Sequence, residues 1–477
     1  MKRTILLLAA AICSIQMWAK VELPSIISDN MVLQQNADVA LWGWTEPGRK
    51  VKVSASWTKK TASVVAGEDG KFMVRIPTVA AGGPYTLTFN DGDKTVLSNI
   101  LLGEVWFCSG QSNMEMPMEG FTNQPVEGAT KVIATAKPSR DIRMVTVTKC
   151  ASLKEEERPA GGSWEENTPE AVAKTSATAY FFADMLEQIL GVPVGLLITD
   201  WGGTPIEAWV DRATIESGFA SEFDLSFLDG SALPESASKQ PCTLFNGQVS
   251  PLIPYTFKGM LWYQGCDNRH RAEQYTRLQP AYVKMMREKF DNPDAPFYFV
   301  QLAPYKYSLP TKFHQGYINE AQEKTLDLIP NSGMATTLDI GEFGTIHPCK
   351  KQPVGERLAL LALQDTYGAK GYEAHSPRYE SMRIEGSSII VRLSTAKGGI
   401  SPIGVQLSGF ELAGEDRIFH PATGLVRSFG VVVTSPEVEH PVAVRYCFRN
   451  WEEATLFNDY GIPVGPFRSD NWDDIEK

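Results

Sequence analysis

The chain opens, after its first twenty residues, with short apolar runs that partly alternate with polar positions between about Val21 and Asn99. Turn-forming residues separate these runs, as in Glu46-Pro47-Gly48 and Asn90-Asp91-Gly92. Short strands at this spacing are typical of a small all-β domain. The pattern therefore predicts a β-sandwich over residues 20–100.

From Gly103 onward the pattern changes, because apolar runs of strand length alternate with segments of helical periodicity. The sequence predicts strands at 103–108, 141–148, 192–199, 257–263, 297–301 and 334–340. It predicts helices at 171–190, after Pro205, and at 273–290, 317–329 and 353–367. This alternation is typical of a parallel sheet with helices on both faces. We therefore expect one α/β domain over residues 101–370, with residues 217–243 as a long surface loop.

Strand-like runs return from about Tyr372, including MRIEGSSIIVRLS and FHPATGLVRSFGVVVTS, with turn residues between them. They predict a second β-sandwich over residues 371–477.

The N-terminus has the form of a secretory signal peptide. Basic Lys2 and Arg3 precede an apolar stretch, and Ala19 offers a small residue for cleavage before Lys20. We expect residues 1–19 to be removed and the protein to be exported, either to a periplasm or out of the cell. No later stretch is long and apolar enough to predict insertion into a membrane.

Composition narrows the functional classes. The formal net charge is -11 and no basic stripe is visible, so nucleic acid is not an expected partner. Of the seven cysteines, Cys13 lies in the signal segment, and the rest form no CxxC pair. No HExxH motif is present either, so the sequence predicts neither a metal site nor another cofactor. It gives no indication of the oligomeric state.

Candidate chemistry lies where predicted strands end. Ser112, Gly203, Gln264 and the segment from Asp339 to His347 each follow a strand. Because the carboxyl ends of parallel strands open on one edge of a sheet, we expect these four loops to lie together. Ser112 is a candidate nucleophile, although a serine after a strand commonly serves only as a helix N-cap.

These loops resemble the sialate O-acetylesterases within the SGNH hydrolase group. The resemblance rests on the motifs GQSNMEM, WGGTPIEAW, WYQG and IHPxxKQxxGxRLA, and it extends from Gly103 to about Tyr367. It implies an SGNH-type, flavodoxin-like sheet and an exported carbohydrate esterase that removes acetyl groups from sugar hydroxyls, without fixing which sugar. We expect O-acetyl esters of sialic acid to be the substrate. The β-domain before Gly103 also agrees with the layout of that family.

The resemblance also implies roles for individual residues. Ser112 would be the nucleophile and His347 its general base, which later protonates the leaving sugar oxygen. The backbone N–H groups of Ser112 and Gly203 and the side-chain amide of Gln264 would bind the oxyanion. The alternatives are structural: His347 as a loop histidine, Gly203 as a turn glycine and Gln264 as a strand-end cap.

Two features depart from the family pattern. An acidic residue usually stands two or three positions before the histidine, where this chain has Thr345 and Gly344. Asp339, or else Glu342, would have to orient the imidazole, unless a backbone carbonyl completes a Ser–His dyad. We take Asp339 as the candidate catalytic acid.

The second departure is a pair of cysteines near the proposed site. Cys266 and Cys349 stand where the family often has other residues, and an exported protein would permit a disulfide between them. The alternative is two unpaired thiols that lie too far apart to be bridged.

The substrate also remains open at this point. A sialic acid carboxylate would require a cationic or amide partner, and Lys350, Lys351 and Arg357 are near His347 in sequence. One alternative is a deacetylase of xylan or another acetylated glycan. A second is a carbohydrate-binding protein without catalytic activity.

Overall fold

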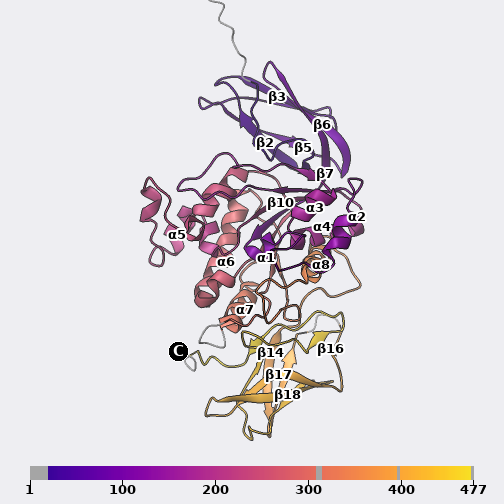
Figure 1. Cartoon of the computed structure of the whole chain (residues 1–477), viewed down its shortest axis with the longest axis vertical. Helices are drawn as coiled ribbons and strands as arrows, with labels where there is room; N and C mark the ends of the chain where they lie inside the picture. Colours follow the sequence, from indigo (N-terminus) through magenta and orange to yellow (C-terminus); the bar gives the residue numbers. More distant parts are fainter. Residues whose placement is uncertain (1–19, 308–313, 395–397, 474–477) are drawn as a thin grey trace, which may run out of the picture.

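A computed structural model describes residues 20–307, 314–394 and 398–473, and these form three regions stacked along one long axis (Figure 1). An N-terminal β-region lies at one end, an α/β region lies in the middle, and a second β-region lies at the other end. The predicted signal peptide falls outside the described residues. Among the described helices, none has the length and hydropathy needed to cross a bilayer.

The N-terminal strands fall into two sheets. One is an antiparallel pair of β2 and β5, and the other contains β1, β3, β4, β6 and the first half of β7. The bounds are β1 (Val32–Gln34), β2 (Asp38–Trp44), β3 (Lys50–Ala55), β4 (Thr61–Val65), β5 (Lys71–Pro77) and β6 (Gly82–Asn90). The alternating side chains of β5 are buried and exposed in turn, as expected for a strand with one face on a core.

Strand β7 (Lys94–Gly110) joins the first two regions. Its first half pairs antiparallel with β6, and its second half pairs parallel with β10 and β11. The boundary predicted at residues 100–101 therefore falls inside one continuous strand. The two regions also share one hydrophobic core, which extends from Val21 to Ala374.

The central sheet has the strand order β13-β12-β11-β7-β10-β8, with the short β9 paired antiparallel at the β8 edge. Its six parallel strands are β7, β8 (Ile142–Thr146), β10 (Val194–Asp200), β11 (Gly259–Tyr263), β12 (Phe297–Val300) and β13 (Ser332–Ala335). Without β8, the remaining five strands have the order 2-1-3-4-5, which is the flavodoxin-like order. The strands β8, β11 and β12 lie within the predicted ones, and β10 ends one residue beyond its predicted end. The strand β7 is longer than predicted, whereas the strand predicted at 334–340 begins at Ser332 and ends at Ala335. Burial of both sheet faces explains their continuous apolar runs.

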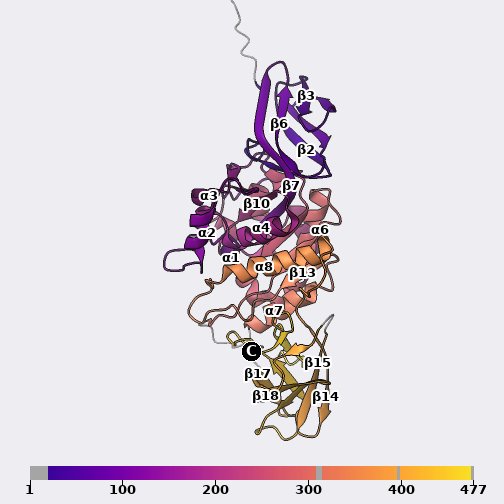
Figure 2. The same cartoon turned by 90° about the vertical axis from the view of Figure 1, so that its right-hand side faces the viewer.

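Helices cover both faces of this sheet, as Figure 2 shows. The helices α4 (Ala177–Leu190) and α8 (Lys351–Leu361) pack together, as do α6 (Ala272–Lys289) and α7 (His314–Thr325). Two consecutive residues of β7 contact the two helix pairs, one residue for each pair. Trp106 contacts Phe182 of α4, and Phe107 contacts Phe290 at the end of α6. Because neighbouring side chains of a strand point to opposite faces, the two helix pairs lie on opposite sides.

Several predicted helices need correction. The predicted helix at 171–190 is two helices, α3 (Pro169–Lys174) and α4, because Thr175 adopts an extended conformation. The Ser176 hydroxyl then accepts the Ala179 N–H and caps α4. After Pro205 only a short 3₁₀ turn forms, over Ile206–Trp209. The predicted loop at 217–243 contains the 3₁₀ turns Ser226–Asp229 and Ala237–Lys239.

The C-terminal region is one antiparallel sheet with its own core, together with a short two-stranded ribbon, β16 (Ile400–Ser401) with β21 (Phe457–Asn458). The sheet order is β14-β15-β19-β18-β17-β20-β22, with bounds β14 (Tyr379–Glu385), β15 (Ser388–Leu393), β17 (Gln406–Ala413), β18 (Phe419–Arg427), β19 (Gly430–Thr434), β20 (Ala443–Tyr446) and β22 (Phe467–Arg468). Tyr379 and Phe467, on the two edge strands, stack with ring centroids 5.1 Å apart. The predicted second sandwich is therefore a single, nearly closed sheet. Register shifts in β14 and β17 favour this curvature.

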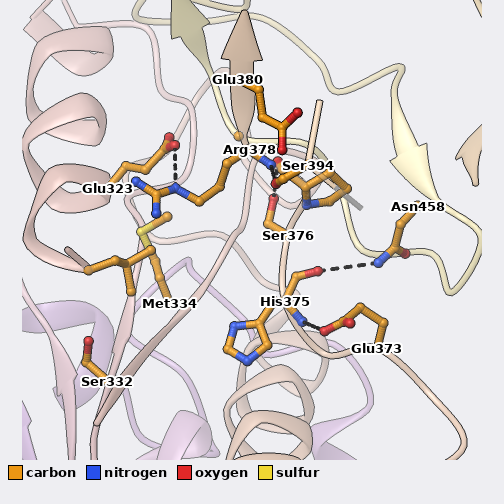
Figure 3. A pocket seen from close by; sticks show the side chains of 13 residues that line it. Glu323, Ser332, Met334, Glu373, His375, Ser376, Arg378, Glu380, Ser394 and Asn458 are labelled. Atoms are coloured by element: carbon orange, nitrogen blue, oxygen red, sulfur yellow. Dashed lines mark hydrogen bonds and ion pairs between the residues drawn. The ribbon is translucent and has the colours of Figure 1, made fainter. Parts of the chain in front are cut away.

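Ion pairs attach this region to the central one. Arg378 pairs with Glu323 of α7 at 3.0 Å, and Arg468 pairs with Glu320 at 2.9 Å. A cavity of about 410 Å³ lies at this junction, and Figure 3 shows Glu323 and Arg378 in its wall. None of the predicted site residues lines this cavity. We therefore interpret it as a feature of the junction.

Candidate active site

Ser112 lies directly beyond the carboxyl end of β7, in the middle of the central sheet. It is the first residue of the short helix α1 (Ser112–Glu115) and is half-buried. The Gln111 N–H donates to the Tyr263 carbonyl at 3.0 Å, and the Gly265 N–H donates to the Gln111 side-chain oxygen at 3.0 Å. The ends of β7 and β11 therefore fix the segment that carries Ser112.

His347 approaches Ser112 from the segment between β13 and α8. Its Nε2 atom is 2.7 Å from Ser112 Oγ. Its Nδ1 atom is 2.5 Å from the side-chain oxygen of Gln124, and the Phe121 ring meets the imidazole edge-to-face at 5.3 Å. The structure thus brings together the two residues predicted as nucleophile and base, and it adds Gln124, which the sequence did not suggest.

The environment of His347 favours the neutral imidazole. Burial lowers its pKa from 6.5 to about 4, the positive charge of Lys351 acts in the same direction, and the negative charge of Glu115 opposes them. A neutral imidazole can accept the proton of a serine hydroxyl.

Lys351 is fully buried and lies near enough to His347 for its charge to act on the imidazole. It donates to the Asn113 side-chain oxygen, and the Asn113 amide donates to the Ile346 carbonyl at 3.0 Å. Burial lowers the pKa of Lys351 to about 7. Lys351 therefore supports the segments on both sides of the pair, because Asn113 follows Ser112 and Ile346 precedes His347.

The loop after β10 is held by Glu115. Its carboxylate accepts the Gly202 N–H at 2.5 Å and pairs with Lys149 at 2.5 Å. Asp200, buried at the end of β10, has a pKa raised to about 7, by burial first and by the charge of Glu115 second. Glu115 lies in the recognised motif, although the sequence did not indicate that it contacts this loop.

Gly203 follows with a φ of +68°, in the left-handed region that favours glycine. Its N–H has no protein acceptor among the described residues. Gly203 therefore keeps a backbone N–H without a protein acceptor, whereas the N–H of the neighbouring Gly202 is bound to Glu115. Its part in an oxyanion site remains a prediction.

Gln264 is completely buried, and its amide hydrogens have other acceptors. Its Nε2 donates to the Thr204 carbonyl at 3.1 Å and to the Asn268 side-chain oxygen at 2.7 Å. The same Asn268 oxygen accepts the Ile206 N–H. The predicted oxyanion donor therefore acts in this structure as a connection between two loops, which is closer to the structural alternative.

The two acidic candidates do not contact His347. Asp339 forms a two-pronged ion pair with Arg357, both bonds at 2.7 Å, and Glu342 accepts the Cys349 N–H at 2.5 Å. The structure thus does not support Asp339 as the residue that orients the imidazole. Arg357 lies on α8, six residues or about 1.7 turns after Lys351, and its guanidinium binds Asp339.

The proposed disulfide is wrong, because Cys266 and Cys349 are both free. Burial raises the pKa of each thiol to about 11, so neither is a reactive thiolate near neutral pH. Within residues 20–307, 314–394 and 398–473, no group of three potential metal ligands is found.

Two of the three cations considered for a carboxylate substrate have partners already. Lys351 binds Asn113, and Arg357 binds Asp339. Lys350 is exposed on the surface.

Comparison with known proteins agrees with this arrangement. The family model for "Carbohydrate esterase, sialic acid-specific acetylesterase" matches residues 102–363. Human sialate O-acetylesterase is 29% identical over 402 residues, which cover 76% of this chain and 74% of the human protein. The rat enzyme of the same name is 28% identical over 430 residues, which cover 78% of each chain.

A solved structure matches nearly the whole chain. It is that of a carbohydrate acetylesterase from Xanthomonas citri, with a TM-score of 0.86 and 33% identity. The match covers 95% of this chain and 100% of that one.

Proposed function

Because the chain belongs to the carbohydrate esterase family of sialic acid-specific acetylesterases, we propose that it hydrolyses O-acetyl esters of sialic acid through an acyl-enzyme on Ser112. Carbohydrate acetylesterase activity is common to this family and to the similar Xanthomonas citri enzyme. The observation that carries the proposed mechanism is the 2.7 Å separation of His347 Nε2 and Ser112 Oγ at the carboxyl edge of the sheet.

The first half of the reaction would transfer the acetyl group. Ser112 Oγ attacks the acetyl carbonyl carbon while His347 Nε2 takes the hydroxyl proton. The tetrahedral intermediate then collapses, the bond from carbonyl carbon to sugar oxygen breaks, and His347 returns the proton to that oxygen. The free sugar hydroxyl leaves, and acetyl-Ser112 remains.

The second half uses water in the place of the serine. His347 takes a proton from water, the resulting oxygen attacks the acetyl carbonyl, and Ser112 Oγ leaves and regains its proton. The products are acetate and free enzyme. A neutral imidazole is required at the start of each half, and burial of His347 favours that form.

The N–H groups of Ser112 and Gly203 are the proposed donors to the oxyanion. Gly202 is excluded from this role because its N–H already donates to Glu115. The Gln264 amide has two other acceptors, so it supports the loop that carries Gly203 instead. Losing one oxyanion donor typically costs about 2.7–4 kcal/mol of transition-state stabilisation.

A second candidate is deacetylation of a neutral glycan such as acetylated xylan. The pairing of Lys351 and Arg357 with other side chains favours it, because a sialic acid carboxylate would need a cation or amides of its own. A carbohydrate-binding protein without activity is less well supported, because Ser112 and His347 are in hydrogen-bonding contact.

We also propose an SGNH-type sheet and export by the N-terminal signal. The order of the five central strands and the position of Ser112 after the first of them support the former. The basic and apolar pattern of residues 1–19 supports the latter. Edman sequencing of protein recovered from an exporting host should begin at or near Lys20, and an intact N-terminus would contradict export.

Acetate release tests the activity. Wild type and Ser112→Ala would be compared on O-acetylated sialic acid and on acetylated xylan. Ser112-dependent release from sialic acid would support both mechanism and substrate. Release from xylan alone would retain the mechanism and replace the substrate. If neither substrate shows Ser112-dependent release, the protein is better explained as a binding protein.

A further inference from the structure

The loop between α1 and α2 (Ala129–Thr135) places Gln124 against the side of His347 that faces away from Ser112. Gln124 and Phe121 exchange backbone hydrogen bonds across a tight turn, at 2.9 and 3.0 Å. Asn123 in this turn has a φ of +60°, a conformation that asparagine tolerates better than most residues. Gln124 is half-buried, and its side-chain oxygen lies 2.5 Å from His347 Nδ1.

Backbone hydrogen bonds hold this loop at both of its ends. On one side the Met118 N–H donates to the Thr175 carbonyl at 2.8 Å. On the other side the Glu127 N–H donates to the Cys349 carbonyl at 2.9 Å, two residues after His347. The loop and the histidine segment are therefore joined by their main chains. The position of Gln124 relative to the imidazole does not depend on the side-chain contact alone.

The contact determines which nitrogen carries the proton of the neutral ring. The side-chain oxygen of glutamine can only accept a hydrogen bond. Nδ1 must therefore hold the proton and donate it to Gln124, which leaves the lone pair of Nε2 directed toward the Ser112 hydroxyl. This is the tautomer that a general base requires, and in a Ser–His–Asp triad a carboxylate selects it.

We propose that Gln124 is the positioning residue of this enzyme, and that its neutral amide orients His347 in the place where related sites use an acid. The inference rests on the proposed Ser112–His347 mechanism. The acids nearest in sequence are bound elsewhere, Asp339 to Arg357 and Glu342 to the Cys349 N–H.

A neutral amide has a specific consequence. It fixes the tautomer as a carboxylate does, but it adds no negative charge to stabilise the imidazolium that forms during the reaction. The charged groups that act on the ring are Lys351, which disfavours the imidazolium, and Glu115, which favours it. Glu127 and Glu342 are bound to Cys349, two residues after His347, and not to the imidazole. Introducing a carboxylate at position 124 should therefore raise the pKa of His347.

The test compares Gln124→Ala, Gln124→Glu and a control, Thr122→Ala, which alters an exposed residue of the same turn. The probe is 4-nitrophenyl acetate, whose hydrolysis needs no sugar contacts. We expect kcat of Gln124→Ala to fall by about 10- to 100-fold, with little change in KM. This is less than the roughly 10²–10⁴-fold of a general base itself, because Ser112 and His347 both remain. Gln124→Glu should retain activity near pH 7 and shift the acid limb of kcat/KM to higher pH. Thr122→Ala should match wild type.

The outcomes separate this inference from the proposed function. If Ser112→Ala still hydrolyses the probe at the wild-type rate, the proposed mechanism itself fails. If Ser112→Ala is inactive while Gln124→Ala has wild-type kcat, only the role of Gln124 is overturned. A loss in Gln124→Ala that Thr122→Ala shares would indicate a structural effect of the turn, and an unshifted acid limb in Gln124→Glu would likewise count against the inference.

Discussion

His347 Nε2 and Ser112 Oγ lie 2.7 Å apart although 235 positions separate the two residues in the chain. The contact arises because β7 ends in the middle of the sheet and the segment before α8 crosses its carboxyl edge. Figures 1 and 2 show α1 and α8 beside each other in both views. The strands β10 and β11 pair with β7 on its two sides, and both therefore help to fix the position of Ser112.

The pH dependence of the reaction should report on His347. Its pKa is lowered to about 4, chiefly by burial. The base is then neutral across the weakly acidic and neutral range. We expect kcat/KM for acetate release to be level above about pH 5 and to fall with a slope of one below about pH 4. Initial rates between pH 3 and 8 would measure this, and an acid limb near pH 6.5 would contradict the lowered pKa.

The same shift affects folding stability. An unfolded histidine titrates near pH 6.5, so the unfolded chain binds more protons than the folded one between about pH 4 and 6.5. The contribution of His347 to stability is therefore complete above that window and is lost as the pH falls through it.

Lys351→Met removes a positive charge that lowers the pKa of His347. This variant should therefore move the acid limb of the kcat/KM profile to higher pH.

Replacing Asp339 should affect stability more than catalysis. Asp339→Asn weakens the two-pronged pair with Arg357, whose side chain is 10% exposed. We expect the free energy of unfolding to fall by about 1.5–3 kcal/mol, the usual range for hydrogen bonds to charged groups. We expect kcat to stay within about threefold of wild type, since Asp339 does not contact His347. Chemical denaturation and steady-state rates measure the two effects.

Arg357→Met serves as the matched control, because it removes the other half of the same pair. It should destabilise the protein while kcat is retained. A loss of about 10⁴-fold in kcat for Asp339→Asn, as seen when a triad acid is replaced, would restore Asp339 as the catalytic acid.

The sequence was informative for reactive residues that lie directly after a strand. Ser112 and His347 could be proposed because each lies in a recognisable motif after a strand, and the parallel sheet brings such loops to one edge. The same reasoning failed for Asp339. Its distance along the chain from His347 is short, but Arg357 on α8 provides a stronger electrostatic partner.

Gln124 had no comparable signal. It lies in an irregular loop without a motif, and its place beside His347 depends on main-chain contacts with Thr175 and Cys349, which are distant in sequence. Unlike the role of Gln124, the division of the predicted helix at 171–190 had a signal in the sequence. Serine is a preferred N-cap residue, so Ser176 could have indicated the start of α4. The closure of the C-terminal sheet depends on edge-strand contacts that periodicity does not reveal.

Glu115 should matter for rate through the loop that carries Gly202. Glu115→Ala removes the acceptor of the Gly202 N–H and the partner of Lys149. A hydrogen bond to a charged group is worth about 1.5–3 kcal/mol, so kcat should fall by about 10- to 100-fold if the loop loses its position. Steady-state kinetics would measure the change.

The control for this variant is Lys149→Met, which removes the partially exposed cation and its contact with the Trp201 ring but leaves the bond from the Gly202 N–H to Glu115 in place. Because exposed ion pairs contribute about 0–1 kcal/mol, its kcat should remain close to wild type. Equal losses in the two variants would show that the ion pair, and not the bond to Gly202, is what the reaction requires.

Gly202 and Gly203 should respond differently to the same substitution. A Cβ on Gly202 would lie 3.1 Å from the Ser112 Cβ and 3.0 Å from a Glu115 carboxylate oxygen, whereas a Cβ on Gly203 would meet no atom within 4 Å. Gly202→Ala must therefore displace either the nucleophile or the carboxylate that holds the loop. The required shift is a few tenths of an ångström. Because a displacement of about 1 Å near the reacting atoms can cost about 10²-fold in rate, we expect a loss of kcat below about 10²-fold.

Gly203→Ala instead forces a non-glycine residue into a left-handed conformation at φ +68°, which costs about 1–2 kcal/mol of stability. It keeps the backbone N–H proposed for the oxyanion, so kcat should fall less than in Gly202→Ala while the melting temperature falls more. Thermal unfolding and kcat on the same acetylated substrate would distinguish the two glycines. If Gly203→Ala proved the more damaging to kcat, the open space beside Gly203 would be where the substrate lies, because the added methyl group would then obstruct it.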